Sequence, residues 1–468
     1  MPEFHYIPVA DHQARVLRVV PLLAEDTLDL EDAAGHTLAR DAVAALDLPP
    51  WDNSAMDGYA VRSADTTSAT TDAPVRLDVV AELPAGTDLD PPLGPGQAAR
   101  IMTGAPLPTD ADSVVPLEDT VGWDPAAPTA GTTRPDHVEL GAPVAAGRHV
   151  RPRGDDVRAG HRVASAGQEL APHRLSAVAA AGIAAVTVRR RPRVVVVSTG
   201  SELVAPGEPV RRGQIPDSNS HLLTALVRAS GGEVVHRGQV SDDPARLRDL
   251  LGSTAADSDA VIVTGGASVG AHDVARLVLA PDAAGGVPLE RRPAVHASPG
   301  DGSPSPRGTG GGPETPTDPL DPLDPVDDRA VRFDRVAVQP GKPQGFGLLP
   351  DGRPVWSLPG NPVSAWVSYL VFVEPGLLAM QDRAKPLADW RPVTADEGWR
   401  SPPRREQFVP VRVVSAPGEP VRVAQATERG SGSHLAGRMA RATGLVRVPD
   451  ATTEVSAGDT VLYRALEA

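Results

Sequence analysis

A glycine-rich loop, TGGASVG at residues 264–270, offers the clearest chemistry in the sequence. It follows an apolar run at residues 260–263, which is typical of a buried strand. Glycine lets backbone N–H groups turn toward an anion, and a helix starting after the loop would add the positive end of its dipole. Phosphate is the natural ligand of such a loop, although an ordinary tight strand-to-helix connection carries the same residues. The candidate binding residues are Gly265, Gly266, Ser268 and Gly270.

Acidic residues follow three of the expected strands, close to where each strand ends. They are Glu202, Asp242, Asp243 and Asp273. Carboxylate oxygens are the ligands that Mg²⁺ prefers, and Mg²⁺ commonly shares them with substrate phosphates. We therefore expect carboxylates from the three strand ends, namely Glu202, Asp242 or Asp243, and Asp273, to hold a magnesium ion. Each could instead cap the first turn of a helix, because aspartate is a preferred N-cap residue.

Two proline-rich turns could hold a substrate in register. In LPGNP at residues 358–362, two prolines fix φ and remove N–H groups, which leaves a stiff turn at a helix start or a merely structural one. In PGKP at residues 340–343, Lys342 is one of only two lysines in the chain. Lys342 could give a point charge to phosphate, or it could be a solvated surface residue. The substrate-binding candidates of these turns are Lys342, Pro359, Asn361 and Pro362.

Five loops of this kind lie at or near the carboxyl ends of expected strands. They occupy residues 198–202, 216–220, 264–270, 340–343 and 358–362. Ligands in open α/β sheets bind outside the carboxyl ends of the strands. We therefore expect the five loops to converge on one cleft.

The elements that must position these loops form an α/β domain at residues 191–385. Strand, loop and helix patterns alternate from Arg193 onward, which predicts a parallel sheet with helices on both faces, a three-layer fold. A helix is expected over VSAWVSYLVFV, ending at Glu374-Pro375. Residues 298–328 are rich in Pro, Gly, Asp and Ser, and we interpret them as a disordered insertion.

Three further domains are expected around this one. Helical spacing at residues 8–23 and 28–43, and again at 173–186, predicts that residues 1–50 and 147–190 form one discontinuous helical domain. Short β-type runs place an inserted β domain at residues 51–146. Alternating runs near the carboxyl end predict a small β-barrel at residues 386–468.

Composition limits the classes of function. The chain has 468 residues and a net charge of −15, which argues against a binder of nucleic acid or of anionic membranes. It has no cysteine, so a metal must bind through oxygen or imidazole. The first residues lack a basic start followed by an apolar run, so we expect a cytoplasmic protein without a secretory signal.

Six motifs occur in a fixed order over nearly the whole chain. They are DNSAMDGYAVR (52–62), IMTGAP (101–106), STGSEL (198–203), TGGASVG (264–270), PGKP (340–343) and LPGNPVSA (358–365). In this set the chain resembles the MoeA family, which is also seen as the E domain of gephyrin. The resemblance implies a molybdopterin-binding-type α/β domain, the same four-domain division and an elongated homodimer.

The resemblance also implies a reaction. Adenylylated molybdopterin and molybdate would give molybdenum cofactor and AMP with the help of Mg²⁺, at a cleft between the α/β domain of one subunit and the inserted domain of the other. The implied catalytic residues are Asp57, Thr103, Glu202, Asp242 and Asp273. The implied molybdate ligands are Arg335, Ser364, Arg405 and Ser433. The molybdopterin adenylyltransferase could hand over the pterin, and molybdoenzymes or their chaperones would accept the product.

Two positions depart from the family pattern. Gln339 stands where relatives commonly carry a lysine before the PGKP turn, and Val409-Pro410 follow Phe408 where an arginine is expected. Gln339 removes a positive charge from the oxyanion site, for which Arg335 could compensate. Two rivals follow: an adenylyltransferase, which is normally the α/β domain alone, and a scaffold or degraded paralogue that binds pterin without inserting metal.

Overall fold

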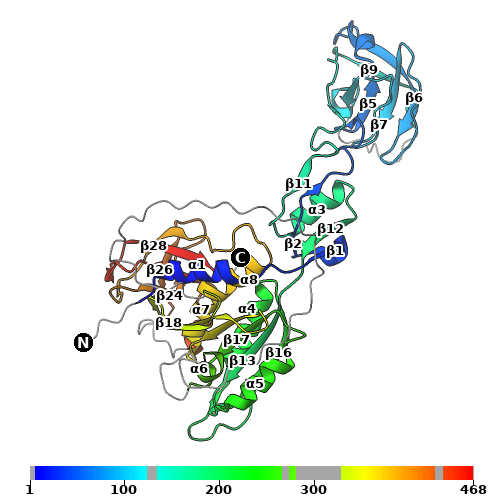
Figure 1. Cartoon of the computed structure of the whole chain (residues 1–468). Helices are drawn as coiled ribbons and strands as arrows, with labels where there is room; N and C mark the ends of the chain where they lie inside the picture. Colours follow the sequence, from blue (N-terminus) through cyan, green and yellow to red (C-terminus); the bar gives the residue numbers. More distant parts are fainter. Residues whose placement is uncertain (1–5, 124–133, 266–272, 281–327, 427–435, 467–468) are drawn as a thin grey trace, which may run out of the picture. The chain divides into compact units, whose positions relative to one another are not determined.

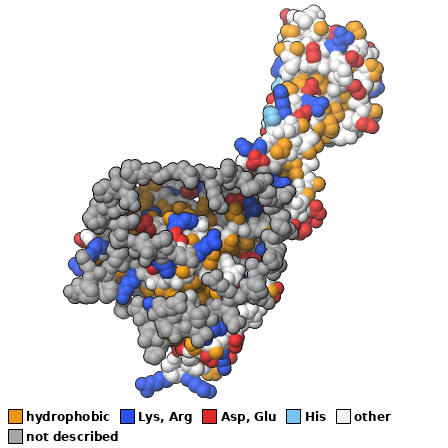
Figure 2. Space-filling view, viewed as in Figure 1, with side chains coloured by type: hydrophobic (Ala, Val, Ile, Leu, Met, Phe, Trp, Pro, Cys, Tyr) orange, Lys and Arg blue, Asp and Glu red, His pale blue; other side chains and the backbone are white. Residues whose placement is uncertain are grey.

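The computed structural model describes residues 6–123, 134–265, 273–280, 328–426 and 436–466. The chain divides into two compact units, residues 27–188 and residues 1–26 with 189–468. The insertion expected at residues 298–328 lies outside the described residues except for Asp328. Figure 1 shows both units with their elements, and Figure 2 shows the same view with the side chains coloured by type.

The larger unit is built on a six-stranded sheet with the order β16-β13-β17-β21-β20-β18. β16, β13, β17 and β21 run parallel, whereas β20 and β18 are antiparallel additions at one edge. The prediction of a parallel sheet was wrong at this edge, because the short turn from β20 to β21 has no room for the crossover of about a dozen residues that parallel pairing needs. The bounds are β13 (Arg193–Thr199), β16 (Glu233–Val240), β17 (Ala260–Thr264), β18 (Arg332–Arg335), β20 (Pro343–Leu348) and β21 (Pro354–Leu358).

Helices cover both faces of this sheet, so the predicted three-layer arrangement is confirmed. Side chains alternate between the faces: Val196 and Ile262 point into one apolar cluster, and Val197 and Val263 point into the other. On the first face lie α1 (Val9–Val19), α4 (Asn219–Ala229), α7 (Pro362–Ser368) and α8 (Glu374–Met380). On the second face lie α5 (Pro244–Ser253) and α6 (Val274–Leu279). A small parallel pair, β14 (Leu203–Val204) and β15 (Ile215–Pro216), lies between β13 and α4 in the chain.

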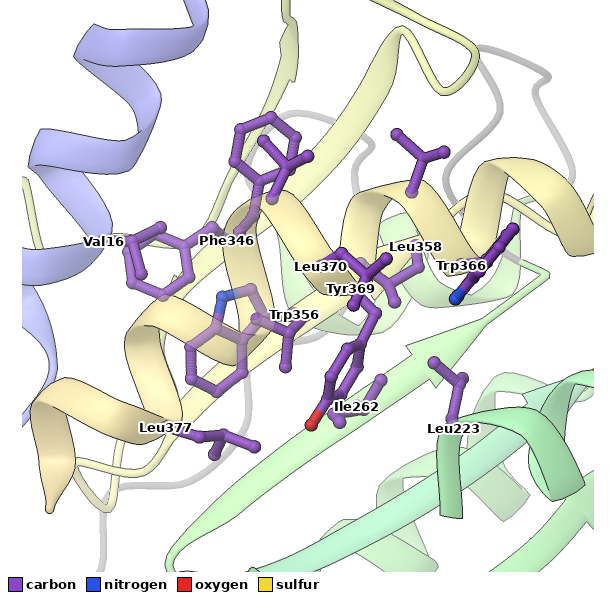
Figure 3. Close-up of a cluster of buried hydrophobic side chains, with 14 of the residues drawn as sticks. Val16, Leu223, Ile262, Phe346, Trp356, Leu358, Trp366, Tyr369, Leu370 and Leu377 are labelled. Atoms are coloured by element: carbon purple, nitrogen blue, oxygen red, sulfur yellow. The ribbon is translucent and has the colours of Figure 1, made fainter. Parts of the chain in front are cut away.

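A long apolar helix of the described chain lies at Pro362–Met380. It is long and apolar enough to cross a membrane, yet 83% of its most apolar window is buried inside the protein. Figure 3 shows Trp366, Tyr369 and Leu370 of this segment among the side chains of the sheet. The segment is therefore the core helix of this unit.

The sequence predicted that the core helix ends at Glu374-Pro375, and this prediction was wrong. A π-helical turn, η4 (Tyr369–Val373), joins α7 to α8, and Pro375 stands in the first turn of α8. The π turn interrupts the regular i to i−4 hydrogen bonds just before the proline. Since the regular hydrogen bonds are already interrupted there, the missing N–H of Pro375 does not end the helix, which continues to Met380.

The amino-terminal helix α1 belongs to the α/β unit. Its buried Val9 and Val16 join the apolar cluster of α8 and β20, and Ile7 N donates to the carbonyl of Arg335 at 2.9 Å. The sequence grouped α1 with residues 147–190. The sequence of an amphipathic helix indicates which of its faces is buried, but it does not indicate which part of the protein packs against that face.

The smaller unit contains a five-stranded sheet with the order β8-β5-β7-β6-β9. Each of the β-type runs expected between residues 59 and 144 forms one of these strands, and apolar clusters cover both faces. The bounds are β5 (Gly58–Val61), β6 (Val75–Leu83), β7 (Gln97–Ile101), β8 (Ser113–Pro116) and β9 (His137–Leu140), with 3₁₀ turns η1 (Ser63–Thr66) and η2 (Leu117–Asp119).

Residues 27–50 pack against residues 147–188 within the same unit. Leu38 and Val178 share a buried cluster, and β3 pairs with β11. The helix expected over residues 28–43 is wrong: only one helical turn forms, and Gly35 follows it with a φ of 75° that ends the helix. The bounds are β1 (Glu25–Asp29), α2 (Leu30–Ala33), β2 (Thr37–Leu38), β3 (Ala42–Val43), β4 (Asn53–Ser54), β10 (Val150–Arg151), β11 (Arg162–Ala164), α3 (Pro172–Ala180) and β12 (Ala185–Arg189).

The carboxyl-terminal strands close into a barrel, as predicted. The order β24-β25-β22-β28-β26 returns to β24 through an additional pairing, and β19 adds alongside β24 in parallel. Phe408 on β24 faces the α/β core, whereas Val409 and Val411 lie in the core of the barrel. The bounds are β19 (Val338–Gln339), β22 (Arg391–Ala395), β23 (Trp399–Arg400), β24 (Glu406–Val413), β25 (Arg422–Gln425), α9 (Ala436–Met439), β26 (Gly444–Val448), β27 (Glu454–Val455) and β28 (Thr460–Ala465).

Candidate active site

A network of buried polar side chains joins the carboxyl ends of two neighbouring strands to the start of a helix. Asn219, at the start of α4, donates through Nδ2 to Thr264 Oγ1 at 3.0 Å and to the carbonyl of Gly360 at 2.7 Å. Thr264 Oγ1 in turn donates to the carbonyl of Pro359 at 3.1 Å. Because these groups are shielded from water, each satisfied hydrogen bond fixes the relative position of the chain segments that it joins. The ends of β17 and β21 and the start of α4 therefore form a rigid floor.

Gly265 continues this floor into the glycine-rich loop. Its φ is 108°, and a Cβ at this position would lie 2.2 Å from the carbonyl oxygen of Thr199. Only glycine therefore lets β17 leave the sheet beside the end of β13. The remaining candidates of the loop, Gly266, Ser268 and Gly270, lie outside the described residues.

The segment before α4 also belongs to the floor. Asp217 is buried and accepts hydrogen bonds from Ser198 Oγ at 2.9 Å and from the backbone N–H of Ser220 at 3.1 Å. The loops at 198–202, 216–220, 264–265 and 358–362 thus meet at one edge of the sheet, as predicted. Parallel strands bring their carboxyl ends to the same edge.

The acidic residues divide by role. Asp273 caps α6 by accepting from Arg276 N at 3.2 Å, and Asp243 caps α5 by accepting from Ala245 N at 2.9 Å. Asp242 accepts from Ser201 N at 3.0 Å, which joins the loop after β16 to the loop after β13. Glu202 lies exposed in that second loop. The capping interpretation is therefore confirmed for Asp243 and Asp273.

The structure does not gather the three expected metal ligands into a cage. Within the described residues, no group of three or more His, Asp or Glu side chains is placed to hold a metal ion. The donors that are present, Glu202 and Asp242 on joined loops, are carboxylates, which suit Mg²⁺ when substrate phosphates supply further oxygens.

The PGKP turn reaches the same edge of the sheet because β20 runs antiparallel to β21. Gln344 is buried and donates through Nε2 to the carbonyl of Gly341 and to Ser368 Oγ, both at 2.6 Å. The carbonyl of Lys342 accepts from Val336 N at 2.8 Å. These bonds hold the backbone of the turn, so the half-buried Lys342 projects from a fixed base.

The expected molybdate ligands that the structure describes surround this turn. A Cβ on Gly341 would lie 3.5 Å from the carbonyl of Ser364, a buried residue in the first turn of α7. Arg335 pairs with Pro343 across β18 and β20. Arg405 donates through Nη1 to Gln339 Oε1 at 2.9 Å. Ser433 lies outside the described residues.

Lys342 and Arg405 differ from most half-buried cations of this unit. Arg447 pairs with Glu406 and Arg464 pairs with Glu374, both at 2.6 Å. Across the part of the chain that the structure describes, neither Lys342 nor Arg405 has a carboxylate oxygen within 4.0 Å. Two uncompensated cations beside the strand ends are suited to binding an anion.

In the smaller unit, the structure brings Asp57 and Thr103 into contact. Asp57 Oδ1 accepts from Thr103 N at 2.7 Å and from Thr103 Oγ1 at 2.8 Å. Gly58 follows at the start of β5, which lies between β8 and β7 in the sheet, and a Cβ there would lie 2.0 Å from the carbonyl oxygen of Val115. The close approach of β8 explains this glycine. Burial raises the pKa of the neighbouring Tyr59, which keeps its phenol protonated.

Sequence reasoning missed the residues that hold the site rather than line it. Asn219, Gln344 and Ser368 are buried polar side chains that pin the loops, and none was named as a site residue. The available signal was weak: Asn219 lies in the polar run PDSNS before a helix, and Gln344 follows the PGKP turn. The carbonyl of His149, which accepts from Ala55 N at 2.8 Å in the loop before Asp57, was also missed.

Comparisons with known proteins cover nearly the whole chain. The MoeA N-terminal region (domains I and II) matches residues 7–182, a probable molybdopterin binding domain matches residues 195–311, and the MoeA C-terminal region (domain IV) matches residues 392–466. A molybdopterin molybdenumtransferase 2 from Mycobacterium tuberculosis is 37% identical over 450 residues, which make up 96% of this chain and 97% of that protein. The chain belongs to the molybdopterin molybdenumtransferase family.

Further relatives agree with this assignment. A molybdopterin molybdenumtransferase from Nostoc sp. is 32% identical and aligns over 98% of this chain and 93% of its own length. A crystal structure of the molybdopterin biosynthesis MoeA protein from Pyrococcus is 26% identical, covers 99% of this chain and 100% of its own, and has a TM-score of 0.71. The protein is therefore an enzyme of this transferase family, with a role in molybdenum cofactor biosynthesis.

The candidate site residues fall in different matched regions. Asp57 and Thr103 lie in the matched amino-terminal region, and Gly265 lies in the probable molybdopterin binding domain. Arg405 lies in the matched carboxyl-terminal region, whereas Lys342 lies between the second and third matches.

Proposed function

We propose that the enzyme inserts molybdenum into adenylylated molybdopterin, consuming molybdate and releasing AMP. The observation that carries this proposal is the pair Lys342 and Arg405, two half-buried cations without a carboxylate partner among the described residues, at the edge where the strands end. The start of the glycine-rich loop, at residues 264–265, and the turn at residues 340–343 that carries Lys342 meet at this edge. Such a pair fits a substrate with phosphate groups and a separate oxyanion.

The residues near Lys342 would bind molybdate. Lys342 and Arg405 would supply positive charge, and Ser364 would supply a hydroxyl donor from α7. Arg335 and Ser433 complete the proposed set. The rigid base of the turn supports this role, because Gln344 and Val336 hold its backbone while the cations remain available.

The glycine-rich loop would bind the phosphate end of the pterin nucleotide. Gly265 leaves the sheet at the rigid floor, and Gly266, Ser268 and Gly270 would provide the N–H and hydroxyl donors. Pro359, Asn361 and Pro362 form the adjoining stiff turn, with Pro362 as the first residue of α7. A fixed turn would hold the substrate in register with molybdate.

Glu202, Asp242 and Asp273 would hold a magnesium ion together with phosphate oxygens of the substrate. The bound cation would offset the negative charge that develops as the phosphoanhydride releases AMP. Asp242 already joins two of the strand-end loops through Ser201 N, so both loops would be ordered before substrate binds. The capping bond of Asp273 would orient its carboxylate at the start of α6.

A homodimer would complete the site. Asp57 and Thr103 form an exposed, hydrogen-bonded pair in the smaller unit, and we propose that this pair acts at the strand-end cleft of the other subunit. The hydrogen bonds from Thr103 would keep the Asp57 carboxylate oriented for that contact.

We further propose that the enzyme acts in the cytoplasm, receives pterin from the adenylyltransferase and delivers cofactor to molybdoenzymes or their chaperones.

The test is AMP release by the purified enzyme with adenylylated molybdopterin, molybdate and Mg²⁺. We expect release that requires all three, and a molybdate KM that rises in Lys342→Ala and Arg405→Ala while the KM for the pterin does not. Pterin binding without AMP release would instead support the scaffold role that Gln339 suggested. If both KM values rise, the proposal that molybdate binds at Lys342 and Arg405 is wrong.

A further inference from the structure

Gln339 joins the α/β sheet region to the carboxyl-terminal barrel. It belongs to the two-residue strand β19, which pairs in parallel with β24 through Gln339 and Gln407. Its side-chain amide oxygen accepts the hydrogen bond of Arg405 Nη1 at 2.9 Å. Both side chains are half-buried. The contact therefore ties a cation of the barrel to the turn that carries Lys342.

The backbone before Arg405 is held in an unusual conformation. Arg404 has a φ of 57°, in the left-handed region that residues other than glycine, asparagine and aspartate rarely adopt. Its N–H donates to the carbonyl of Asp450 at 3.1 Å, which fixes the turn into β24. Such strain persists only where the surroundings maintain it, so the direction in which Arg405 leaves the chain is set by the fold.

The nearest carboxylate in the chain does not neutralise Arg405. Glu406 is the next residue, but its Oε2 accepts from Arg447 Nε at 2.6 Å. Arg405 is left with a neutral acceptor, the amide oxygen of Gln339. A carboxylate at position 339 would hold the guanidinium more strongly, but it would also cancel its charge.

We propose that Gln339 is a positioning residue, whose neutral amide aims Arg405 at the oxyanion substrate without reducing its positive charge. This inference rests on the proposed function, in which Arg405 binds molybdate. An anion site gains from a guanidinium that is both oriented and uncompensated, since each lost orientation or charge weakens the contact. The amide of glutamine meets both conditions, and neither leucine nor glutamate does.

Two substitutions separate orientation from charge. Gln339→Glu keeps the acceptor but pairs Arg405 with a carboxylate, and we expect the KM for molybdate to rise about 10-fold, because about 1.4 kcal/mol of anion binding is lost. Gln339→Leu removes the acceptor and should raise this KM by a smaller factor. In both variants kcat at saturating molybdate and the KM for adenylylated molybdopterin should stay as in the unsubstituted enzyme. Calorimetric titration with sodium molybdate alone gives a second readout of the same affinity.

Gln425→Glu is the matched control. Gln425 is half-buried on β25 of the same barrel, opposite Val411 and about 20 Å along β24 from Arg405 at 3.3 Å per residue. This change should leave the molybdate KM unaltered. If Arg405→Ala raises the molybdate KM but Gln339→Glu does not, the positioning role is overturned and the molybdate site stands. If Arg405→Ala also leaves the KM and the calorimetric affinity unchanged, the molybdate site itself is misplaced.

Discussion

Asp273 has two roles open to it, and two substitutions separate them. As the N-cap of α6, its carboxylate accepts a hydrogen bond from Arg276 N at 3.2 Å. Asparagine caps about as well as aspartate, whereas alanine costs about 1 kcal/mol. Asp273→Asn should therefore leave stability unchanged. Asp273→Ala should lower the Tm by about 2–4 °C, the shift expected for this loss in a large domain.

Cation binding predicts a different ranking. A carboxylate 4 Å from a positive charge contributes about 4 kcal/mol at an effective dielectric constant of about 20, which corresponds to roughly 1,000-fold. Asp273→Asn removes this charge while keeping shape and cap. We therefore expect AMP release to fall by between about 100- and 1,000-fold in both Asp273→Asn and Asp273→Ala.

Asp243 provides the matched control. It caps the neighbouring helix α5 through Ala245 N at 2.9 Å, and it is not one of the proposed cation ligands. Asp243→Ala should lose a similar capping energy and keep its AMP release. The measurements are AMP release at saturating substrates and thermal unfolding of all four variants, Asp243→Asn included. Near-normal AMP release by Asp273→Asn, with lowered stability only in the alanine variants, would refute the cation role and leave Asp273 as a cap.

Two further predictions concern stability and the floor of the site. Burial, together with Arg15, lowers the pKa of His12 to about 3, so only the unfolded chain takes up this proton as pH falls below its ordinary value of 6.5. The free energy of unfolding should drop by about 2 kcal/mol between pH 6.5 and pH 5 through this group. Urea unfolding of His12→Leu should lack this part of the pH dependence. An equal drop in the variant would contradict the assignment of the pH dependence to His12. Gly265→Ala should abolish AMP release, since its Cβ would lie 2.2 Å from the carbonyl oxygen of Thr199, whereas Gly252→Ala, on α5 with no atom within 4 Å of a Cβ, should retain release and gain roughly 0.5 kcal/mol of stability.

Local sequence patterns predicted the parts of the fold that depend on neighbouring residues. The apolar run before Thr264, the β runs at residues 75–83 and 444–448, and the helix before Gly231 all appear as expected, because side-chain periodicity and glycine punctuation are local properties. The glycine at position 35 was also visible in the sequence. The helix expected over residues 28–43 nevertheless stops at this glycine. Beyond it, the chain pairs as a strand with residues 162–164, and this pairing competes with the helix.

The course of the core helix shows a limit of local reasoning. Proline after glutamate at 374–375 predicted an end, yet the chain continues as α8. The π turn before Pro375 is stabilised by tertiary burial of Tyr369 and its neighbours, which no local pattern reveals. The partner of α1 was undetermined for the same reason.

The sequence by itself determined that several turns rich in glycine and proline would lie at one edge of an α/β sheet, because parallel strands place their carboxyl ends together. Only the tertiary structure decided which side chains meet there. Antiparallel β20 brings Lys342 to that edge, and the pairing of β19 with β24 brings Arg405 to Gln339. These contacts join residues far apart in the chain, and their energies depend on strand pairing and burial, which residue spacing does not encode.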